Sequence, residues 1–597
     1  MAKNMINEDE VARAHSNGTL ILRLLTYLNP FKLKVFVVLV LLILVMSIGL
    51  VNPLLLEIII DKYIVKKDVN GLFVMAAAMI VLNLISWFAS RHRILLMASV
   101  TNRILLNIRQ ELYTHIQKLS FNFFDNRPVG KVLARVIWDV NSLQALFESS
   151  VTTLIPEFLT FISVAIIMFL LNFKLALASM ATLPFVILTL AGIEIFAHSK
   201  WQTYRNKRSN LNAFTHEDLS GIRVIQAFGA EEEKSRQFKD MVKEMMDAFM
   251  KAVILSDFFW PSVEFCWGLG NIVVFWFSYT LINNGTLSIG KMVAFTLYLS
   301  MFWRPVMNIS NFYNTLITNF SAAERIFEIL DIPPIIADDS NSEVMPLIEG
   351  CVEFKNITFS YDDDPSTKIL NNVSFTVNKG ETIALVGPTG AGKTTIVNLI
   401  SRFYDTQEGE ILIDGKNVKD VELDSLRSQM GIMLQDTFLF SATIRENIRY
   451  GKLNATDDEV ERAALAVNAH GFILKLEKGY DTQVNERGSR LSVGQRQLIS
   501  FARALLADPR ILILDEATSN IDTFTERLVQ EGIKKLLQNR TSFVIAHRLS
   551  TIRDCQKIMV IDNGEIVEAG SHPELMALKG LYYDLYMSQY KFLNEGA

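Results

Sequence analysis

Six apolar segments in the N-terminal half of the chain constrain its fold more than any other feature of the sequence. A helix needs about 20 predominantly apolar residues to cross the hydrocarbon core of a bilayer, and each segment is long enough. Buried core helices of a large soluble protein are the alternative, but a soluble core does not explain so many runs. We therefore predict six membrane-spanning helices, at residues 35–60, 72–90, 146–171, 175–197, 258–282 and 292–316.

The connections between these segments alternate between short and long. Residues 91–145 and 198–257 form the two long connections, and both have a helical pattern. Both are rich in lysine and arginine, so the positive-inside rule places them, together with both chain termini, in the cytoplasm. Lys62, Lys66 and Lys67 would then lie on the outer side, which is a minor departure from the rule.

Charge and cysteine content exclude several classes of protein. A net charge of −5 over 597 residues gives no sign of nucleic-acid binding. Cys266, Cys351 and Cys555 are far apart and form no CxxC pair, which argues against a disulfide framework or a zinc site and fits a reducing compartment. The first residues are polar and charged, so we expect no signal peptide.

The C-terminal part of the chain has the pattern of an α/β domain. Residues 331–347 include Pro333, Pro334 and several acids, and this composition is typical of a linker. Beyond them, β-type runs alternate with helical stretches, which predicts a largely parallel sheet. We therefore expect a membrane α-helical domain at 1–330, the linker, and an α/β domain at 348–597. The β-type runs are residues 352–359, 382–386, 410–413, 430–434, 511–514, 542–546 and 557–561.

A phosphate-binding loop follows one of these strands and opens a helix, and this context makes the GxxxxGK[ST] pattern a strong signal. Glycines let backbone N–H groups turn inward around phosphate oxygens, and the helix N-terminus adds its positive dipole end. Lys393 is expected to reach the β- and γ-phosphates of ATP, and Thr394 to coordinate Mg²⁺. The loop comprises Gly387, Pro388, Thr389, Gly390, Ala391, Gly392, Lys393, Thr394 and Thr395.

Polar residues at the ends of other strands suit the same chemistry. Asp515 would hold the Mg²⁺ shell, and Glu516 would polarise the attacking water. Gln435 could contact Mg²⁺ or that water, and His547 could donate to a γ-phosphate oxygen. Ligands bind at the carboxyl ends of parallel strands, which favours one shared site over unrelated polar strand ends. Tyr361, before the phosphate loop, is a candidate stacking platform for adenine.

Together with Leu491-Ser492-Val493-Gly494-Gln495, these motifs resemble the ATPase domain of ABC transporters. The whole chain resembles an exporter-type half-transporter, in which six spans are fused to one ATPase domain. The resemblance implies that two ATPase domains close head to tail on two ATP molecules. The signature motif of one domain, with Ser492 and the backbone of Gly494 as donors, then lies against the γ-phosphate held by the other. The matching motifs are Tyr361, 387–395, Gln435, 491–495, 511–516, 519–522 and His547.

The signature departs from the LSGGQ that is usual in the family, because Val493 stands in place of the first glycine. A β-branched residue disfavours a positive φ and adds bulk where the backbone should approach phosphate. Glu516 and His547, which the chain contributes to its own site, match the family. We therefore expect a heterodimer with one degenerate ATP site, whose partner has an intact signature and lacks its own catalytic glutamate. A homodimer that tolerates the valine is the alternative.

The resemblance implies ATP hydrolysis coupled to export of a hydrophobic or amphipathic compound, a drug or a lipid, across the plasma membrane of a bacterium. ATP would drive alternating access by closing the two ATPase domains, short helices at the tips of the two long connections would pass that closure to the spans, and hydrolysis would reset it. An ATP-gated channel or a regulator with the same ATPase engine is the alternative. Charged residues within the spans are candidates for cavity lining, and Glu264 and Arg304 also for mutual pairing. These residues are Glu57, Glu157, Glu194, Glu264 and Arg304.

Overall fold

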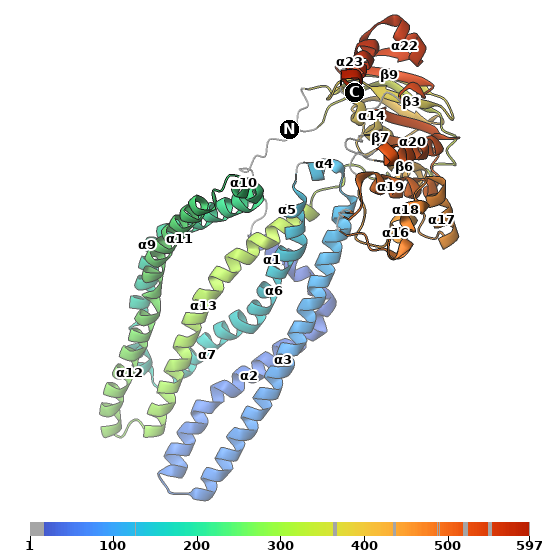
Figure 1. Cartoon of the computed structure of the whole chain (residues 1–597). Coiled ribbons are helices and arrows are strands. Elements are labelled where there is room, and N and C mark those ends of the chain that lie inside the picture. The colour runs from blue at the N-terminus through green and yellow to red at the C-terminus, as the bar shows by residue number, and fades with distance from the viewer. Residues whose placement is uncertain are drawn as a thin grey trace. The chain divides into compact units, whose positions relative to one another are not determined.

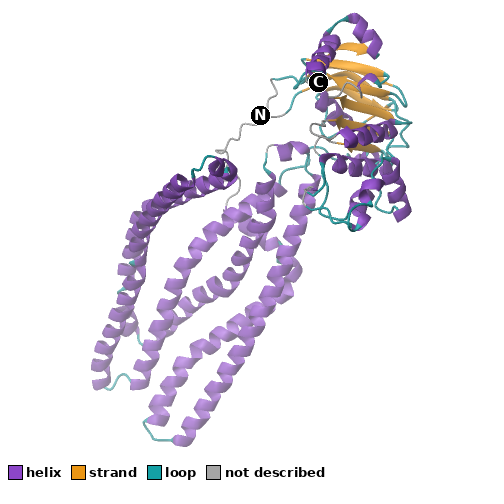
Figure 2. Cartoon of the chain, viewed as in Figure 1, coloured by secondary structure: helices purple, strands orange, loops and turns teal. Residues whose placement is uncertain are grey.

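The computed structural model of the chain divides into two compact units (Figure 1). The first comprises Met1–Ile116 with Gly130–Asp331, and the second comprises Gln117–Val129 with Ile332–Ala597. The tip of the first long connection therefore belongs to the same unit as the C-terminal domain. Among the residues that the structure describes, the first unit is helical and the strands lie in the second (Figure 2). The structure describes residues 17–125, 127–361, 367–433, 437–485, 488, 490–516, 523–546 and 552–595.

Helices are what an apolar, membrane-spanning chain must form, because a helix satisfies its backbone hydrogen bonds internally where no water is present. Several are joined by π-helical turns. The helices up to the linker are α1 (Asn17–Thr26), α2 (Lys32–Ile58), α3 (Val69–Lys118), α4 (Phe121–Asp125), α5 (Val129–Ala134), α6 (Val140–Ser149), α7 (Ile155–Leu171), α8 (Phe173–Met180), α9 (Leu183–Ser220), α10 (Ile222–Ala227), α11 (Glu231–Asp257), α12 (Phe259–Asn283) and α13 (Ile289–Leu330).

Among the described residues, four helical runs are long and apolar enough to cross a membrane, namely Asn29–Ile64, Val69–Lys118, Val129–Leu171 and Glu231–Asn283. They contain the first, second, third and fifth predicted spans, and the sixth lies in α13.

The fourth predicted span is helical but not continuous. Helix α8 ends at Met180 and α9 begins at Leu183, with Pro184 in its first turn. Proline lacks an N–H group and is tolerated at the start of a helix but not in its interior, which accounts for the interruption.

Polar contacts hold the start of α13 against the end of α2. The carboxylate of Asp61, in the π-helical turn after α2, accepts hydrogen bonds from the Ser288 hydroxyl and, at 2.8 Å, from the Gly290 N–H. A Cβ atom on Gly290 would lie 2.6 Å from the carbonyl oxygen of Glu57. Glycine at this position therefore allows the two backbones to approach each other.

A second polar contact joins α13 to α7. The carboxylate of Glu157, whose side chain is 14% exposed, accepts a hydrogen bond from Asn308 at 2.6 Å, and Arg304 lies 3.9 Å away. The sequence left open whether Arg304 and Glu264 line a cavity or pair with each other. The described acid beside Arg304 is instead Glu157, because α7 packs along α13 at this level, while the side chain of Glu264 is exposed.

The second unit contains two sheets, where the sequence predicted one largely parallel sheet. The six-stranded sheet has the order β10-β9-β3-β8-β7-β6 and is parallel except for β10. The four-stranded sheet has the order β2-β1-β4-β5 and is antiparallel. The strands are β1 (Val352–Phe359), β2 (Leu370–Val377), β3 (Thr382–Val386), β4 (Glu408–Ile413), β5 (Lys416–Asn417), β6 (Met430–Met433), β7 (Ile511–Glu516), β8 (Thr541–Ala546), β9 (Lys557–Asp562) and β10 (Glu565–Gly570).

Strand β3 shows how the six-stranded sheet organises the core of the second unit. Ala384 and Val386 belong to one buried apolar cluster, whereas Ile383 and Leu385 belong to another. Successive side chains of a strand point to opposite faces, so a strand buried on both sides must be apolar throughout. The helices of this unit are α14 (Lys393–Ile400), α15 (Leu423–Arg427), α16 (Ile444–Arg449), α17 (Asp457–Ala466), α18 (His470–Ile473), α19 (Val493–Ala507), α20 (Thr523–Leu537), α22 (His572–Leu578) and α23 (Leu581–Glu595).

One buried hydroxyl connects β8 to the segments that lead into β1 and β3. Thr541, which is 1% exposed, donates to the carbonyl of Gly350 at 2.7 Å and accepts from the N–H of Gly380 at 3.0 Å. A single side chain therefore satisfies two backbone groups from different parts of the chain.

Replacing Thr541 with valine keeps the shape of the side chain and removes the hydroxyl. Because Gly350 and Gly380 would lose this partner at a buried position, we expect the second unit to lose ~1–3 kcal/mol of stability. The apparent unfolding temperature of the full-length protein measures the change. Thr376→Val, on an exposed position of β2, is the matched control. Equal unfolding temperatures for the two variants would contradict this account.

Candidate functional site

The phosphate-binding loop turns sharply between β3 and α14. Gly387 and Gly392 have φ values of 153° and 103°, a region in which side chains are strained. A Cβ atom on Gly387 would also lie 2.1 Å from the carbonyl oxygen of Ile561 in β9. Glycine is therefore required for the chain to leave β3 and enter α14 through this turn. Such a turn at a helix N-terminus is the arrangement that binds phosphate groups through backbone N–H donors.

Lys393, the first residue of α14, folds back over the loop. Its ammonium donates to the carbonyl oxygens of Gly387 at 2.9 Å and Pro388 at 2.8 Å, and the residue is 8% exposed. Burial lowers the pKa of Lys393, and the nearby carboxylate of Asp515 opposes this shift. A cation held over a phosphate loop and facing a carboxylate is well placed to bind polyphosphate oxygens.

The two threonines after Lys393 lie in different environments. Thr394 is exposed at the start of α14, so its hydroxyl is accessible to a ligand, whereas Thr395 is buried. Thr395 places its hydroxyl 3.1 Å from that of Tyr361. The predicted adenine platform therefore lies beside the phosphate-binding helix. Of the remaining loop residues, Ala391 is buried, and those exposed are Pro388, Thr389 and Gly390.

The parallel pairing of β6, β7 and β8 aligns the ends of these strands at one edge of the sheet. Met433 pairs with Leu514, and Asp515 pairs with Ile545. Strand β8 also pairs with β3, which leads into the phosphate loop. This register explains why the Asp515 carboxylate acts on the pKa of Lys393, although the two residues are far apart in the sequence.

Of the other predicted catalytic residues, the structure describes Glu516 alone. Glu516 is the last residue of β7, and its backbone pairs with Ala546 of β8. Gln435 and His547 lie outside the described residues, as do residues 519–522. The strands that precede Gln435 and His547 in the chain are β6 and β8, which flank β7 on its two sides.

The signature residues form the start of α19. The Ser492 hydroxyl accepts from the Gln495 N–H at 3.2 Å, and the Ser492 N–H donates to the Gln495 side chain at 3.0 Å. This reciprocal pair is a capping box, which fixes where a helix begins. The sequence predicted that the signature residues bind phosphate. In the structure, the side chains of Ser492 and Gln495 hold the N-terminus of α19 in place. Gly494 is buried.

Of the two effects expected of Val493, a strained positive φ and added bulk, the structure removes the first. Val493 is the first residue of α19 and its φ is not positive, so the expected conflict between β-branching and a positive φ is wrong. What distinguishes valine from glycine here is the side chain itself, because Val493 is 38% exposed at the helix N-terminus. Its exposed isopropyl group is the bulk that the sequence led us to expect at this position.

Sequence reasoning missed the residues that contact helix α4, at the tip of the first long connection. The rings of Phe121 and Phe403 lie 4.5 Å apart, and the Tyr404 hydroxyl donates to the carboxylate of Asp125. Tyr404 also packs edge-on against Tyr361, with ring centroids 5.1 Å apart. The aromatic pair Phe403-Tyr404 lies shortly after the phosphate-binding helix in the sequence and could have indicated this contact. In the structure, the pair joins the predicted adenine platform to α4.

Comparison with known families matches both units of the structure. The model described as the ABC transporter transmembrane region matches residues 35–306, and the model described as ABC transporter matches residues 370–519. A solved structure of a bacterial Atm1-family ABC exporter with ATP bound is 29% identical, with a TM-score of 0.78, and the match covers 94% of this chain and 98% of that one.

Curated relatives extend over almost the whole chain. An uncharacterized ABC transporter ATP-binding protein of Bacillus subtilis, YknV, is 44% identical over 592 residues, which are 98% of this chain and 97% of that protein. An ATP-dependent lipid A-core flippase of Syntrophus aciditrophicus is 39% identical over 542 residues, which are 91% of this chain and 89% of that protein. With its exporter fold and its phosphate-binding loop, the chain belongs to the ABC transporters and couples ATP hydrolysis to transport.

Proposed function

We propose that this chain is one half of a dimeric exporter that moves a hydrophobic or amphipathic compound, a drug or a lipid, across the bacterial plasma membrane. Both termini and the ATPase domain would be cytoplasmic, as the basic long connections favour. The observation that carries this function is the fusion of long apolar helices to a phosphate loop with Lys393 and Asp515 at one sheet edge. The similarity to a lipid A-core flippase supports a lipid-like substrate.

The exposed tip of the second long connection supports a dimer. Four apolar side chains at the end of α9 and around α10 are strongly exposed, although this segment lies in a basic, water-facing connection. An apolar patch of this kind marks a protein–protein contact. We assign the contact to the ATPase domain of a second half-transporter, as the family resemblance implies. The residues are Leu219 (67% exposed), Ile222 (42%), Val224 (61%) and Phe228 (83%).

The side chains around the loop have separate roles in the proposed site. Tyr361 stacks on adenine and Lys393 binds the β- and γ-phosphates. Oxygen donors suit a hard cation such as Mg²⁺, and the exposed Thr394 with Asp515 would hold it, joined by Gln435. The ion neutralises charge on the phosphates when it is bound.

Two residues would act on the reacting groups. Glu516 polarises the attacking water, and His547 donates to a γ-phosphate oxygen. The γ-phosphate of the second ATP in the dimer would rest on the partner-facing signature of this chain, at Ser492, Val493, Gly494 and Gln495.

We favour a heterodimer because the altered signature of this chain would affect only the ATP that the partner holds. Lys393 and Asp515 serve the chain's own ATP, whereas the side chain of Val493 obstructs the ATP that the partner holds. An intact LSGGQ in the partner would complete the ATP site on this chain's phosphate loop, which would be the strong site. The ATP site on the partner's phosphate loop would be degenerate.

Glu516→Gln should preserve ATP binding and lower steady-state hydrolysis by about 100-fold or more, because a glutamine cannot accept a proton from water. Binding of a fluorescent ATP analogue and release of phosphate are measured on the same purified protein. Glu410→Gln, at an exposed position of β4, is the matched control and should hydrolyse ATP normally. Normal turnover in Glu516→Gln would refute the role of Glu516.

The chain expressed alone should not form a stable, fully active dimer. Native mass spectrometry and ATPase measurements test this, with and without co-expression of a neighbouring half-transporter that carries LSGGQ. Val493→Gly is the informative variant, because removing the isopropyl group should raise the ATPase activity of the chain alone. A stable and fully active wild-type homodimer would exclude the obligate heterodimer.

Inside-out vesicles that contain the assembled transporter should accumulate an amphipathic fluorescent probe against its gradient when ATP is supplied. Lys393→Met should abolish accumulation, since the phosphates lose their main cationic contact. Lys379→Met, an exposed lysine before β3, serves as the control and should leave accumulation unchanged. Equilibration of the probe without accumulation would indicate an ATP-gated channel instead.

A further inference from the structure

A cavity of about 590 Å³ lies within the second unit, where the tip of the first long connection, the linker and α15 meet. Cavities that bind small molecules typically enclose about 300–1,000 Å³ and are lined mainly by apolar and aromatic side chains. The described lining includes no residue of the phosphate loop or of the signature, so the cavity is separate from the proposed ATP site. Its apolar lining includes Phe121 and Phe124 of α4, Ile336 of the linker, Phe403 and Leu423.

Arg427, the last residue of α15, adds a guanidinium to this apolar lining. Its Nε donates to the carbonyl oxygen of Ser401 at 3.1 Å, and its Nη2 donates to that of Arg402 at 2.6 Å. The central carbon of the guanidinium lies 5.1 Å from the centroid of the Phe403 ring. Because a guanidinium has five N–H donors, these two hydrogen bonds leave others for a ligand in the cavity.

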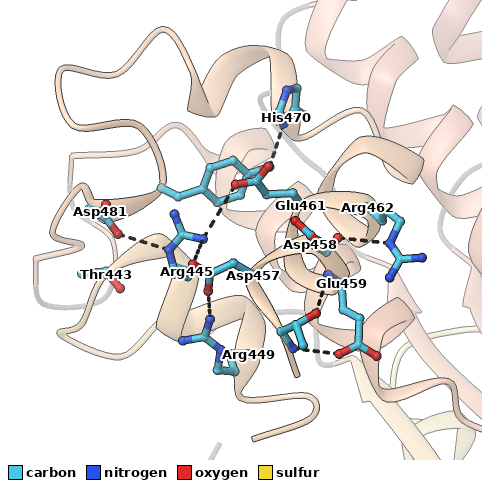
Figure 3. A network of polar contacts seen from close by, with 12 residues as sticks. Thr443, Arg445, Arg449, Asp457, Asp458, Glu459, Glu461, Arg462, His470 and Asp481 are labelled. Carbon is cyan, nitrogen blue, oxygen red and sulfur yellow. Dashed lines mark hydrogen bonds and ion pairs between the residues drawn. The ribbon is translucent and has the colours of Figure 1, made fainter. Parts of the chain in front are cut away.

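The charge of Arg427 is compensated less completely than that of Arg445, an arginine of α16 in the same unit. The Arg445 guanidinium lies 3.1 Å from Asp457, 3.2 Å from Asp481 and 3.8 Å from Glu461 (Figure 3). The acceptors of Arg427 are instead two backbone carbonyls, and among the described residues Arg427 forms no ion pair with a carboxylate. A half-buried cation without such a partner favours the binding of an anion.

The charges around the cavity have a positive balance. Burial and the guanidinium of Arg402 lower the pKa of Arg427, and the carboxylates of Asp338 and Asp405 oppose this shift at longer range. An arginine side chain nevertheless stays charged. The charged residues of the lining are the cations Lys118 and Arg427 and the anion Asp338, so a ligand with a single negative charge would balance them.

We propose that this cavity is a regulatory site for an amphipathic carboxylate, whose head binds Arg427 and whose apolar body lies among Phe121, Phe124 and Phe403. A planar guanidinium matches a carboxylate through paired N–H···O hydrogen bonds, which gives the head a defined orientation. The ligand binds in the second unit and not among the spans, so the site is distinct from the path of an exported compound.

The position of the cavity gives a bound carboxylate an effect on turnover. The tip and the ATPase domain meet here through the rings of Phe121 and Phe403, which lie 4.5 Å apart. The linker joins them, because the Asp338 carboxylate accepts a hydrogen bond from the Leu423 N–H at 2.8 Å. A ligand in the cavity adds contacts to all three segments and restrains their relative movement. It should therefore slow turnover and leave ATP binding intact. This effect, unlike the binding itself, rests on the proposed function.

Photolabelling of the full-length protein in lipid nanodiscs tests the site. The probe is decanoate with a diazirine at the end of its chain, and it should label peptides that contain residues 117–124, 334–338 or Phe403. Decanol with the same diazirine lacks the charge and should label these peptides about 10-fold less. Ala337→Trp places a large side chain in the lining and should abolish their labelling by decanoate. Ala577→Trp, at an exposed position of α22, is the matched control and should be labelled like the wild type.

Variants of Arg427 test the contact with the carboxylate head. Arg427→Met keeps the length of the side chain and removes its charge, so it should lower labelling by decanoate about 10-fold and leave labelling by decanol unchanged. Arg427→Lys keeps the charge and should retain most of the labelling by decanoate. Arg462→Met, an exposed arginine of α17, is the control. If Arg427→Met does not fold, the comparison of decanoate with decanol on the wild type and on Ala337→Trp decides the question.

Steady-state kinetics measure the regulatory effect. Decanoate should lower kcat of the wild type while KM for ATP stays within about two-fold, and it should leave kcat of Ala337→Trp unchanged. Labelling confined to the membrane helices, equal labelling by the two compounds, or labelling that survives Ala337→Trp would overturn the site. An unchanged kcat of the labelled wild type would overturn its regulatory role. A protein that is labelled in the cavity and hydrolyses no ATP would instead refute the proposed function.

Discussion

The parallel pairing of β3, β8, β7 and β6 is the constraint on which the rest of the ATPase unit depends. It places the end of β3, from which the phosphate loop departs, at the same sheet edge as Asp515. Lys393 then lies close enough to Asp515 for the carboxylate to act on its pKa. Because these strands are buried on both faces, their apolar side chains fix the register and hence the position of Asp515 at the end of β7.

Two series of contacts extend from this sheet edge to other elements of the second unit. One runs from Tyr361 through Tyr404 to α4, the tip of the first long connection. The other runs from the loop after β6 through Arg503 to the signature helix. Both depend on one aromatic or cationic side chain that contacts two elements at once.

Val493 illustrates how local structure changes the meaning of a sequence motif. A valine in place of the usual glycine suggested both backbone strain and added bulk. The capping box of Ser492 and Gln495 starts the helix at Val493, which has no positive φ, so the exposed side chain is the difference from glycine that remains.

The sequence by itself determined the apolar helices, the strands that flank the motifs and the identity of the phosphate loop, because hydrophobic periodicity and glycine placement act over short distances. It did not determine the antiparallel second sheet, whose strand β2 is polar and half-buried, or the acid beside Arg304, which depends on how α7 packs on α13. The contacts of Arg503 in α19 were also decided only by the tertiary structure. Two of its three acceptors are the backbone carbonyls of Asn447 and Phe438, which have no sequence signature, and the third is the side-chain oxygen of Asn447. These acceptors converge only after the chain has folded.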